Sequence, residues 1–408
     1  MGALLSVDAE VDQTRTDKRV AAILVSLALA ANNAGAYALS IVAARLLAPS
    51  AFGELSSLLA VLVIGVVPAM GLQTVVALRV ARLRSSKESQ DSGTLLALGL
   101  TTSAIVATIG LILAPVLVFV LHLDSVVPAL LLAVTLGPLT LLGLFHGLLQ
   151  GSGRFALLAG LMSLEGVGKV GGSLLGLLIG GDATGALAGT AIGSYLVIFC
   201  GWVLCGRPRP RKAGWHAGEV LHAAQAMLAL VLLVNLDLVL ARHTLPAAEA
   251  GEYALGAIVT KIAYWLPQAV GVLVLPRFAN GDDRRRILPA ALAVCAALDA
   301  FVLLVSFAFG SRLLSFIGGS GYAASTMPVW PFALAGSMLA LVQILLFSRL
   351  AAGDRRVTLL MWTTVVVETV LVTTWLHSSA AQVVTVAACC AGGLALSGAL
   401  LELRSRRR

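Results

Sequence analysis

The sequence predicts an all-α polytopic membrane protein of about twelve transmembrane helices, in two parallel six-helix lobes around a central cavity, with cytoplasmic N- and C-termini. Three observations predict this class. Of the 408 residues, 59% are hydrophobic and only 12% are charged, whereas roughly a quarter of residues are charged in soluble proteins. Apolar runs of about 20 residues, long enough to cross a bilayer as helices, recur along the chain. Basic residues gather at alternate ends of these runs.

Gly, Pro and clusters of charge divide the chain into spans and leave no segment for a sizeable soluble domain. Each span is expected to be helical, because an open backbone facing lipid would leave its N–H and C=O groups without partners. We predict spans at 20–44, 53–78, 93–121, 127–149, 155–180, 186–206, 219–242, 251–275, 287–309, 327–350, 357–378 and 382–403.

The placement of Lys and Arg sets the predicted orientation, since cytoplasmic segments retain positive charge. With the N-terminus inside, 23 of the 28 basic residues fall on the inner side. Arg45, Arg242 and Arg312 would lie outside, and Lys169 and Lys261 within spans. The net charge of +8 therefore indicates topology and contact with anionic membrane lipids, and we expect no nucleic-acid partner. The pattern predicts a multi-pass protein of the cytoplasmic membrane.

The predicted domain organisation follows the same breaks. Residues 1–19 mix acids and bases without periodicity and are expected to form a flexible cytoplasmic tail. An N-terminal six-helix lobe spans 20–206 and a C-terminal six-helix lobe spans 219–403. The inter-lobe linker, 207–218, is basic and Pro-rich and is placed in the cytoplasm, and 404–408 form a basic cytoplasmic tail.

A repeat relates the two predicted lobes. At an offset of 197 residues, Arg45 and Pro49 align with Arg242 and Pro246, and one inserted residue then aligns Gly53-Glu54 with Gly251-Glu252. Six helices per lobe is an even number, so both lobes start on the same side of the membrane and the repeats are parallel. Parallel repeats facing each other across a cavity are typical of alternating access.

Four stretches resemble bacterial polysaccharide biosynthesis proteins, the lipid-linked oligosaccharide (O-antigen-type) flippases of the multidrug/oligosaccharidyl-lipid/polysaccharide exporter superfamily. They are "ARLLAPSAFGELSSLLAVLVIGVVPAMGLQTVVALRVAR" (44–82), "GLLQGSGRF" (147–155), "NLDLVLARHTLPAAEAGEYALGAIVTK" (235–261) and "SRLLSFIGGSGYAAS" (311–325). The resemblance implies a V-shaped transporter of twelve or fourteen helices that moves an amphipathic substrate, often driven by H⁺ or Na⁺. Twelve spans argue against the fourteen-helix branch that flips peptidoglycan precursors.

Six ionisable residues fall inside the predicted spans, where they are costly unless they face a cavity or a partner. Glu165 and Lys169, one helical turn apart, form either a neutralising pair or a site whose lysine contacts a negatively charged headgroup. Lys261 has no charged neighbour at i±3 or i±4 in its own helix, which favours a cavity role in binding that headgroup. The other three are acids of the second half: Asp237, Asp299 and Glu368.

The concentration of membrane acids in the second half suggests ion coupling. Acids in a dry site take up protons or hold a small cation. Asp299, Glu368 and Asp237 are therefore the main candidates for coupling to H⁺ or Na⁺, with Glu165 as the single candidate in the first half. The alternative is that each acid pairs with Lys261, a hydroxyl or the backbone and only sets packing.

Polar and proline residues complete the candidate site. Asn32 and Asn33, at mid-depth in the first span, would bond a sugar or act as glue between helices. Arg79 and Arg82 would meet a diphosphate entering from the cytoplasm, although topology alone also explains them. Pro68 and Pro267 lie at similar depths in spans two and eight and predict kinks.

We expect a transporter and not an enzyme. The predicted function is flipping of a polyprenyl-(pyro)phosphate-linked saccharide by alternating access, with that lipid, membrane lipids and other membrane proteins of polysaccharide assembly as partners. A cation antiporter of the same fold is the closest alternative, ahead of a membrane glycosyltransferase or polymerase and of a scaffold without transport activity. The five cysteines lie inside spans and the six histidines are scattered. Neither pattern indicates a disulfide, a metal site or a cofactor.

Overall fold

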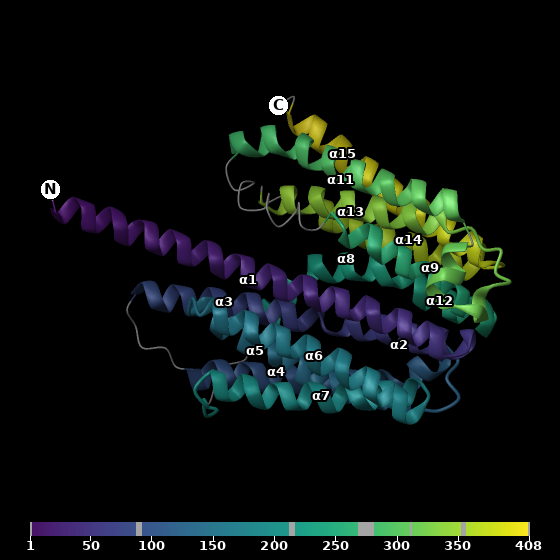
Figure 1. Cartoon of the computed structure of the whole chain (residues 1–408), viewed down its shortest axis with the longest axis horizontal. Helices are drawn as coiled ribbons and strands as arrows, with labels where there is room; N and C mark the ends of the chain where they lie inside the picture. The colour runs from purple at the N-terminus through teal and green to yellow at the C-terminus, as the bar shows by residue number, and fades with distance from the viewer. Residues whose placement is uncertain are drawn as a thin grey trace. The chain divides into compact units, whose positions relative to one another are not determined.

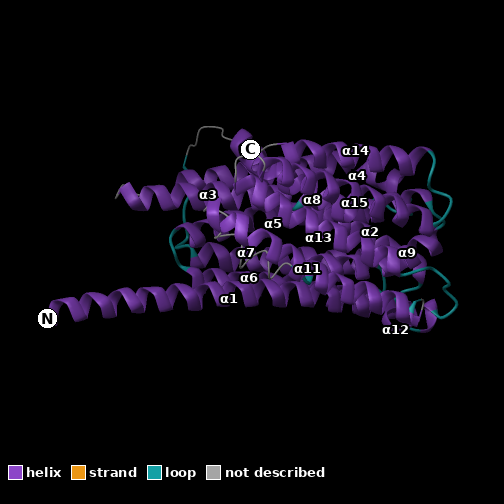
Figure 2. Ribbon diagram, turned by 90° about the horizontal axis from the view of Figure 1, so that it is seen from above, coloured by secondary structure: helices purple, strands orange, loops and turns teal. Residues whose placement is uncertain are grey.

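The computed structural model describes residues 2–86, 92–211, 217–267, 281–310, 312–351 and 356–406, and throughout these ranges every regular element is a helix (Figures 1 and 2). The first half contains α1 (Gly2–Leu46), α2 (Pro49–Gly65), α3 (Val67–Ser86), α4 (Ser92–Leu121), α5 (Val127–Gly151), α6 (Phe155–Gly180) and α7 (Ala183–Leu204). The second half contains α8 (Ala217–Thr244), α9 (Ala247–Trp265), α11 (Gly281–Phe309), α12 (Arg312–Gly318), the short 3₁₀ helix η2 (Ser320–Tyr322), α13 (Trp330–Ala351), α14 (Arg356–Thr374) and α15 (Ala380–Arg406).

The predicted membrane spans are present. Eleven segments of the described residues are helical, long and apolar enough to cross a membrane, and each coincides with a predicted span. The remaining prediction, 251–275, begins within α9 and runs into 268–280, which lie outside the described residues. The chain is a multi-pass membrane protein, as its composition predicts.

Proline breaks the second span where the sequence predicts a kink. The span is continuous in hydropathy from Pro49 to Arg84, yet α2 ends at Gly65 and α3 starts at Val67. Pro68 cannot donate a backbone hydrogen bond, and Ala69 donates instead to the carbonyl of Val66 over 2.9 Å. The corresponding proline of the eighth span, Pro267, follows the last residues of α9.

Residues 2–19 continue α1 as helix, and their assignment to a cytoplasmic tail stays a prediction. Between Gly2 and the first span the sequence has no glycine or proline to end a helix. The apolar span already supplies the costly helical nucleus, so adding each further residue needs only the fixing of one more pair of dihedral angles.

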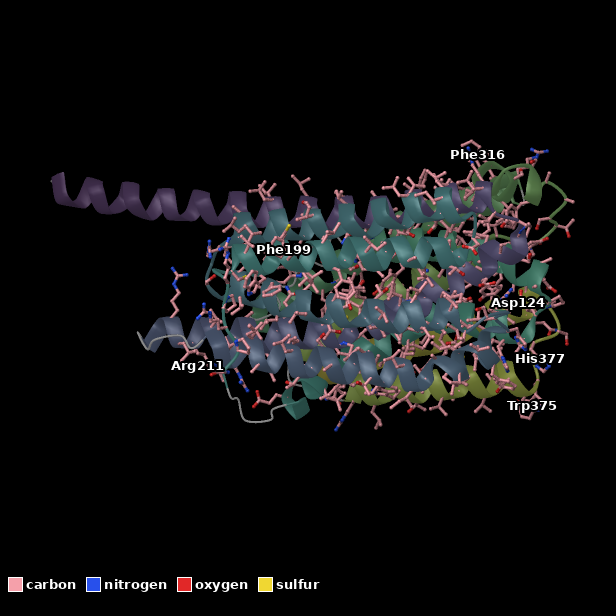
Figure 3. The ribbon with its side chains drawn as sticks, turned by 90° about the horizontal axis from the view of Figure 1, so that it is seen from below. Asp124, Phe199, Arg211, Phe316, Trp375 and His377 are labelled. Carbon is pink, nitrogen blue, oxygen red and sulfur yellow. The ribbon has the colours of Figure 1, made fainter. Side chains whose placement is uncertain are left out.

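The helices divide into two compact units. Unit 1 contains residues 1–39, 65–114 and 127–224, and unit 2 contains 40–64, 115–126 and 225–408. The last turns of α1 and α4 and most of α2 therefore pack with helices of the second half of the chain. In unit 2, Asp124, Phe316, Trp375 and His377 lie at one end (Figure 3), which is the end that the charge pattern predicts to be outside.

A glycine seam joins α6 and α7 in unit 1. At Gly172 and Gly176 of α6, an added Cβ would lie less than 3.0 Å from a backbone carbonyl of α7, and at Gly189 of α7 it would meet α6 equally closely. Small residues at this spacing let two membrane helices approach backbone to backbone. The turn between them is tight, with Gly181 at φ 72° and Asp182 capping α7 through the N–H of Gly185 at 2.7 Å.

Candidate functional site

A cleft of about 340 Å³ lies between α1 and α6 in unit 1. Small side chains open it, because both helices present glycine or alanine at several of the facing positions. Its one amide is Asn32, whose Oδ1 would be 3.0 Å from a Cβ at Gly166. The lining residues are Ala28, Ala31, Asn32, Gly35, Ser163, Gly166, Val167, Val170 and Gly171. Asn33 is half-buried in α1 and is not among them.

Three ionisable side chains lie close together on α5 and α6. Lys169 Nζ is 2.8 Å from Glu165 Oε1, which makes the predicted pair a direct ion pair. The structure adds His146 of α5, whose Nε2 is 3.6 Å from Glu165 Oε2. His146 is buried, the side chain of Glu165 is 13% exposed, and the lysine keeps about a quarter of its side-chain surface exposed. Lys169 lies on α6 but is not among the residues that line the cleft.

The predicted diphosphate contacts, Arg79 and Arg82, lie at the end of α3. Arg79 Nη2 is 2.6 Å from Glu219 Oε2 at the start of α8, so this guanidinium has an acidic partner within unit 1. A neighbouring contact brings the same helices together, because a Cβ at Gly71 would lie 2.6 Å from the carbonyl of Val220. Arg82 is exposed.

A second cluster of ionisable groups lies in unit 2. Asp237 of α8 is buried and accepts a hydrogen bond of 2.8 Å from the hydroxyl of Tyr253 in α9. Lys261, two turns further along α9, interacts electrostatically with Asp237. Glu368 of α14 is buried and interacts with both Asp237 and Tyr253. Three predicted site residues from three helices are thus linked through Asp237.

The remaining predicted acid, Asp299, lies apart from this cluster. It is buried on α11, and its neighbours are Cys295 one turn away and Ser337 of α13. The geometry between the Asp299 carboxylate and the Ser337 hydroxyl falls short of a hydrogen bond, and neither side chain has another hydrogen-bond partner among the described residues. The predicted group of three coupling acids is therefore divided, with two in the cluster and one outside it.

Two of these side chains were missed by the sequence reasoning. His146 is a lone polar residue in the apolar stretch "LLGLFHGLL", and only its depth in the span marks it. Tyr253 stands among small apolar residues of α9, and nothing in the sequence around it indicates the partner of its hydroxyl. A buried tyrosine hydroxyl usually finds a partner, so the depth of Tyr253 is the clue that could have linked it to an acid.

Comparison with solved structures identifies the fold. An inward-facing multidrug resistance MATE family transporter of the MOP superfamily matches with a TM-score of 0.73 and 12% identity, covering 90% of this chain and 93% of that one. The lipid II flippase MurJ, in an inward closed conformation, matches with a TM-score of 0.71 and 14% identity, covering 94% of this chain and 87% of that one. A MOP superfamily transporter from Pyrococcus furiosus, described as having a binding pocket of reverse polarity, matches with a TM-score of 0.59 and 12% identity. The match covers 94% of this chain and 95% of that one.

The chain therefore has the two-lobed fold of the MOP superfamily transporters, which confirms the predicted resemblance at the level of the fold. No protein-family model and no curated protein matches it. At these identities the likeness establishes architecture, and the cargo has to be argued from the side chains.

Proposed function

We propose that the protein flips a polyprenyl-(pyro)phosphate-linked saccharide across the cytoplasmic membrane by alternating access, for the biosynthesis of a cell-surface polysaccharide. The proposed lobes are 20–206 and 219–403, joined by the cytoplasmic linker 207–218. Its partners would be the lipid-linked saccharide, membrane lipids and other membrane proteins of polysaccharide assembly. Both a lipid flippase and drug transporters share its fold.

The lack of an acid in the described lining of the α1–α6 cleft is the observation that favours this cargo. Its described lining contains an amide and a hydroxyl but no carboxylate, whereas a site for an organic cation would want acids. The ammonium group of Lys169, on α6 but not among the lining residues, suits an anionic headgroup. Asn32 could bond the hydroxyls of a sugar. Together these groups suit a ligand with a negative charge and a polar glycan.

The acid cluster of unit 2 supports ion coupling. Asp237, Glu368 and Lys261 carry a formal charge of −1 when all three are ionised, and charges buried without compensation cost several kcal/mol. One proton or one monovalent cation would balance the cluster. Asp299 is a second candidate, since a buried carboxylate without a hydrogen-bond partner also needs a proton or a cation. The proposed driver is therefore H⁺ or Na⁺.

Transport in liposomes tests the proposal. Purified protein would be reconstituted with a fluorescent polyprenyl-pyrophosphate-linked saccharide, with and without a proton or sodium gradient. We expect outward movement that the Lys169→Ala and Lys261→Ala variants slow at least tenfold, whereas Arg312→Ala, which removes an exposed positive charge outside the spans, leaves the rate unchanged. Equal rates in all four proteins would refute the anion site.

The coupling ion is tested in the same vesicles. Asp299→Asn and Glu368→Gln, which keep side-chain volume and remove the ionisable group, are expected to abolish the response of the rate to the gradient. A response that survives in both variants would refute the coupling role of these acids.

A cation antiporter is the second candidate, favoured by the likeness to multidrug MATE transporters and by the net negative charge of the unit 2 cluster. A cellular assay separates the two functions. Loss of a flippase should leave lipid-linked saccharide on the cytoplasmic leaflet. Loss of an antiporter should change drug sensitivity and leave that lipid pool unchanged.

A further inference from the structure

Equivalent residues of the two repeats meet at one end of unit 2. Gly53 of α2 and Gly251 of α9, aligned in the sequence repeat, face each other, and a Cβ at Gly53 would lie 2.9 Å from the backbone nitrogen of Gly251. A Cβ at Gly251 would collide with the carbonyl of Pro49. Two copies of one pattern therefore touch at the same glycine, as residues do at a twofold axis. We call this contact, with Arg45 and Arg242, the repeat junction.

Each repeat contributes one arginine to the junction. Arg45, at the end of α1, donates to the carbonyls of Phe316 at 2.7 Å and Ile317 at 3.1 Å, in the last turn of α12. Arg242, near the end of α8, donates to the carbonyl of Leu121 at 3.0 Å, the last residue of α4. The final carbonyls of a helix lack partners in the helix and carry partial negative charge. Both arginines therefore cap a helix of the other half of the chain.

The junction has two arms, one in which Arg45 caps α12 and one in which Arg242 of α8 caps α4. The arms differ in the residue that follows the arginine. Next to Arg45 the sequence has Leu46, whereas next to Arg242 it has His243. The Nδ1 of His243 is 3.0 Å from the carbonyl of Val120 in α4, so this nitrogen carries the proton in the contact. The ring of His243 also stacks on His122, with centroids 5.4 Å apart and planes inclined by 21°. Only the α4–α8 arm holds a pair of imidazoles.

We propose that the stacked His122–His243 pair makes the α4–α8 arm a pH-sensitive latch, closed when both rings are neutral and released when both are protonated. The proposal rests on the proposed transport function, in which the junction closes the end of the protein predicted to lie outside. His122 is exposed and His243 is partly exposed, so both rings can exchange protons with water.

The carbonyl of Val120, near the end of α4, attracts a protonated His243, and the positive charges around the pair oppose this attraction. Two imidazolium rings at stacking distance repel each other, and Arg242 adds a third positive charge beside them. The acids near this arm are Asp124, after α4, and Glu54, in α2, and both interact with Arg242. Phe119, whose ring centroid is 6.3 Å from that of His243, adds only apolar contact. Two acids thus face three positive charges once both rings are protonated.

The pH range follows from ordinary imidazole chemistry. Imidazole is the side-chain group whose charge ordinarily changes between about pH 5 and pH 8, so the latch is tested between about pH 7.5 and pH 5.5. The contact is therefore fully present on the alkaline side and is lost as the pH falls through this range. Release of the α4–α8 contact at acid pH would make opening of the outer end depend on the proton concentration outside the cell.

Spin-label distances test the latch without any cargo. The five native cysteines would be replaced, and cysteines placed at Val126, after α4, and Ala248, at the start of α9, both exposed. Between pH 7.5 and 5.5 we expect the distance distribution to gain a longer component, at least threefold more populated at pH 5.5. His122→Gln and His243→Gln should each remove most of this change.

His377→Gln is the matched control. This histidine lies at the same end of unit 2 (Figure 3) and its Nδ1 is 2.9 Å from the carbonyl of Val372, outside the junction. A pH response that is absent in the parent protein, or that persists in both junction variants, would overturn the latch. Because no saccharide is used, this failure would leave the liposome test of flipping unaffected, and a failure of flipping would leave the distance change standing.

Discussion

Replacing Gly172 by alanine should separate α6 from α7. The seam holds the two helices with carbonyl groups of one against Cα atoms of the other, and the added methyl group would point at the carbonyl of Gly189. That carbonyl is bonded within its own helix and cannot turn away. Relief of the collision therefore requires movement of one whole helix, and not the rotation of a side chain.

The size of the effect follows from the geometry. The added Cβ would press on the carbonyl oxygen of Gly189 and must move to about 3.5 Å for an ordinary contact, so the helices must part by roughly 1 Å or more. Overpacking of this kind costs about 1–3 kcal/mol. Alanine by itself favours a helix over glycine by about 1 kcal/mol. Gly160 of α6 supplies the matched control, because a Cβ there meets nothing within 4 Å.

Thermal unfolding in detergent, followed by the loss of the monodisperse peak in size-exclusion chromatography, measures the difference. We expect Gly172→Ala to unfold several degrees below the parent protein and Gly160→Ala at or above it. Both variants replace glycine by alanine on the same helix, so effects on membrane insertion and helix propensity cancel between them. The remaining difference in stability reports the contact with α7. If Gly172→Ala is as stable as Gly160→Ala, the seam is not the close contact described and the reasoning fails.

Three further predictions concern polar contacts. Tyr253→Phe removes the hydrogen bond to buried Asp237 without changing shape and should lower the free energy of unfolding by about 1.5–3 kcal/mol; an unchanged melting temperature would argue against the cluster. Arg349 Nε is 3.1 Å from Glu402 Oε2 in a buried pair. Arg349→Met should therefore lower the free energy of unfolding by about 3–5 kcal/mol, and the double variant with Glu402→Leu should recover most of this loss. The partly exposed pair of Arg79 and Glu219 should contribute at most about 1 kcal/mol in a double-mutant cycle, and a coupling several times larger would contradict this.

The sequence predicts much of the helical architecture because hydropathy is a local property. A run of about 20 apolar residues has few alternatives in a bilayer, so most of the predicted spans coincide with described helices. Proline acts equally locally, and the break before Pro68 falls where the missing N–H requires it. The alignment of Arg45 with Arg242 also holds in space, since both cap the end of a distant helix.

The candidate site was only partly predictable. Glu165 and Lys169 lie one turn apart, so helical geometry alone forms their ion pair. Lys261, in contrast, has no acidic residue at i±3 or i±4 on its own helix, and its electrostatic partner, Asp237, comes from α8. Sequence spacing carries no information about which faces of separate helices meet.

Amino-acid order by itself determined where the chain crosses the membrane and where the second span breaks, because each depends on residues within a few turns. Only the tertiary structure decided that Tyr253 binds Asp237, that His146 joins Glu165, that Asp299 stands apart and that His122 stacks on His243. These contacts join residues of different helices. Their formation depends on how small residues such as those of the α6–α7 seam let whole helices approach, which is a property of the packed bundle.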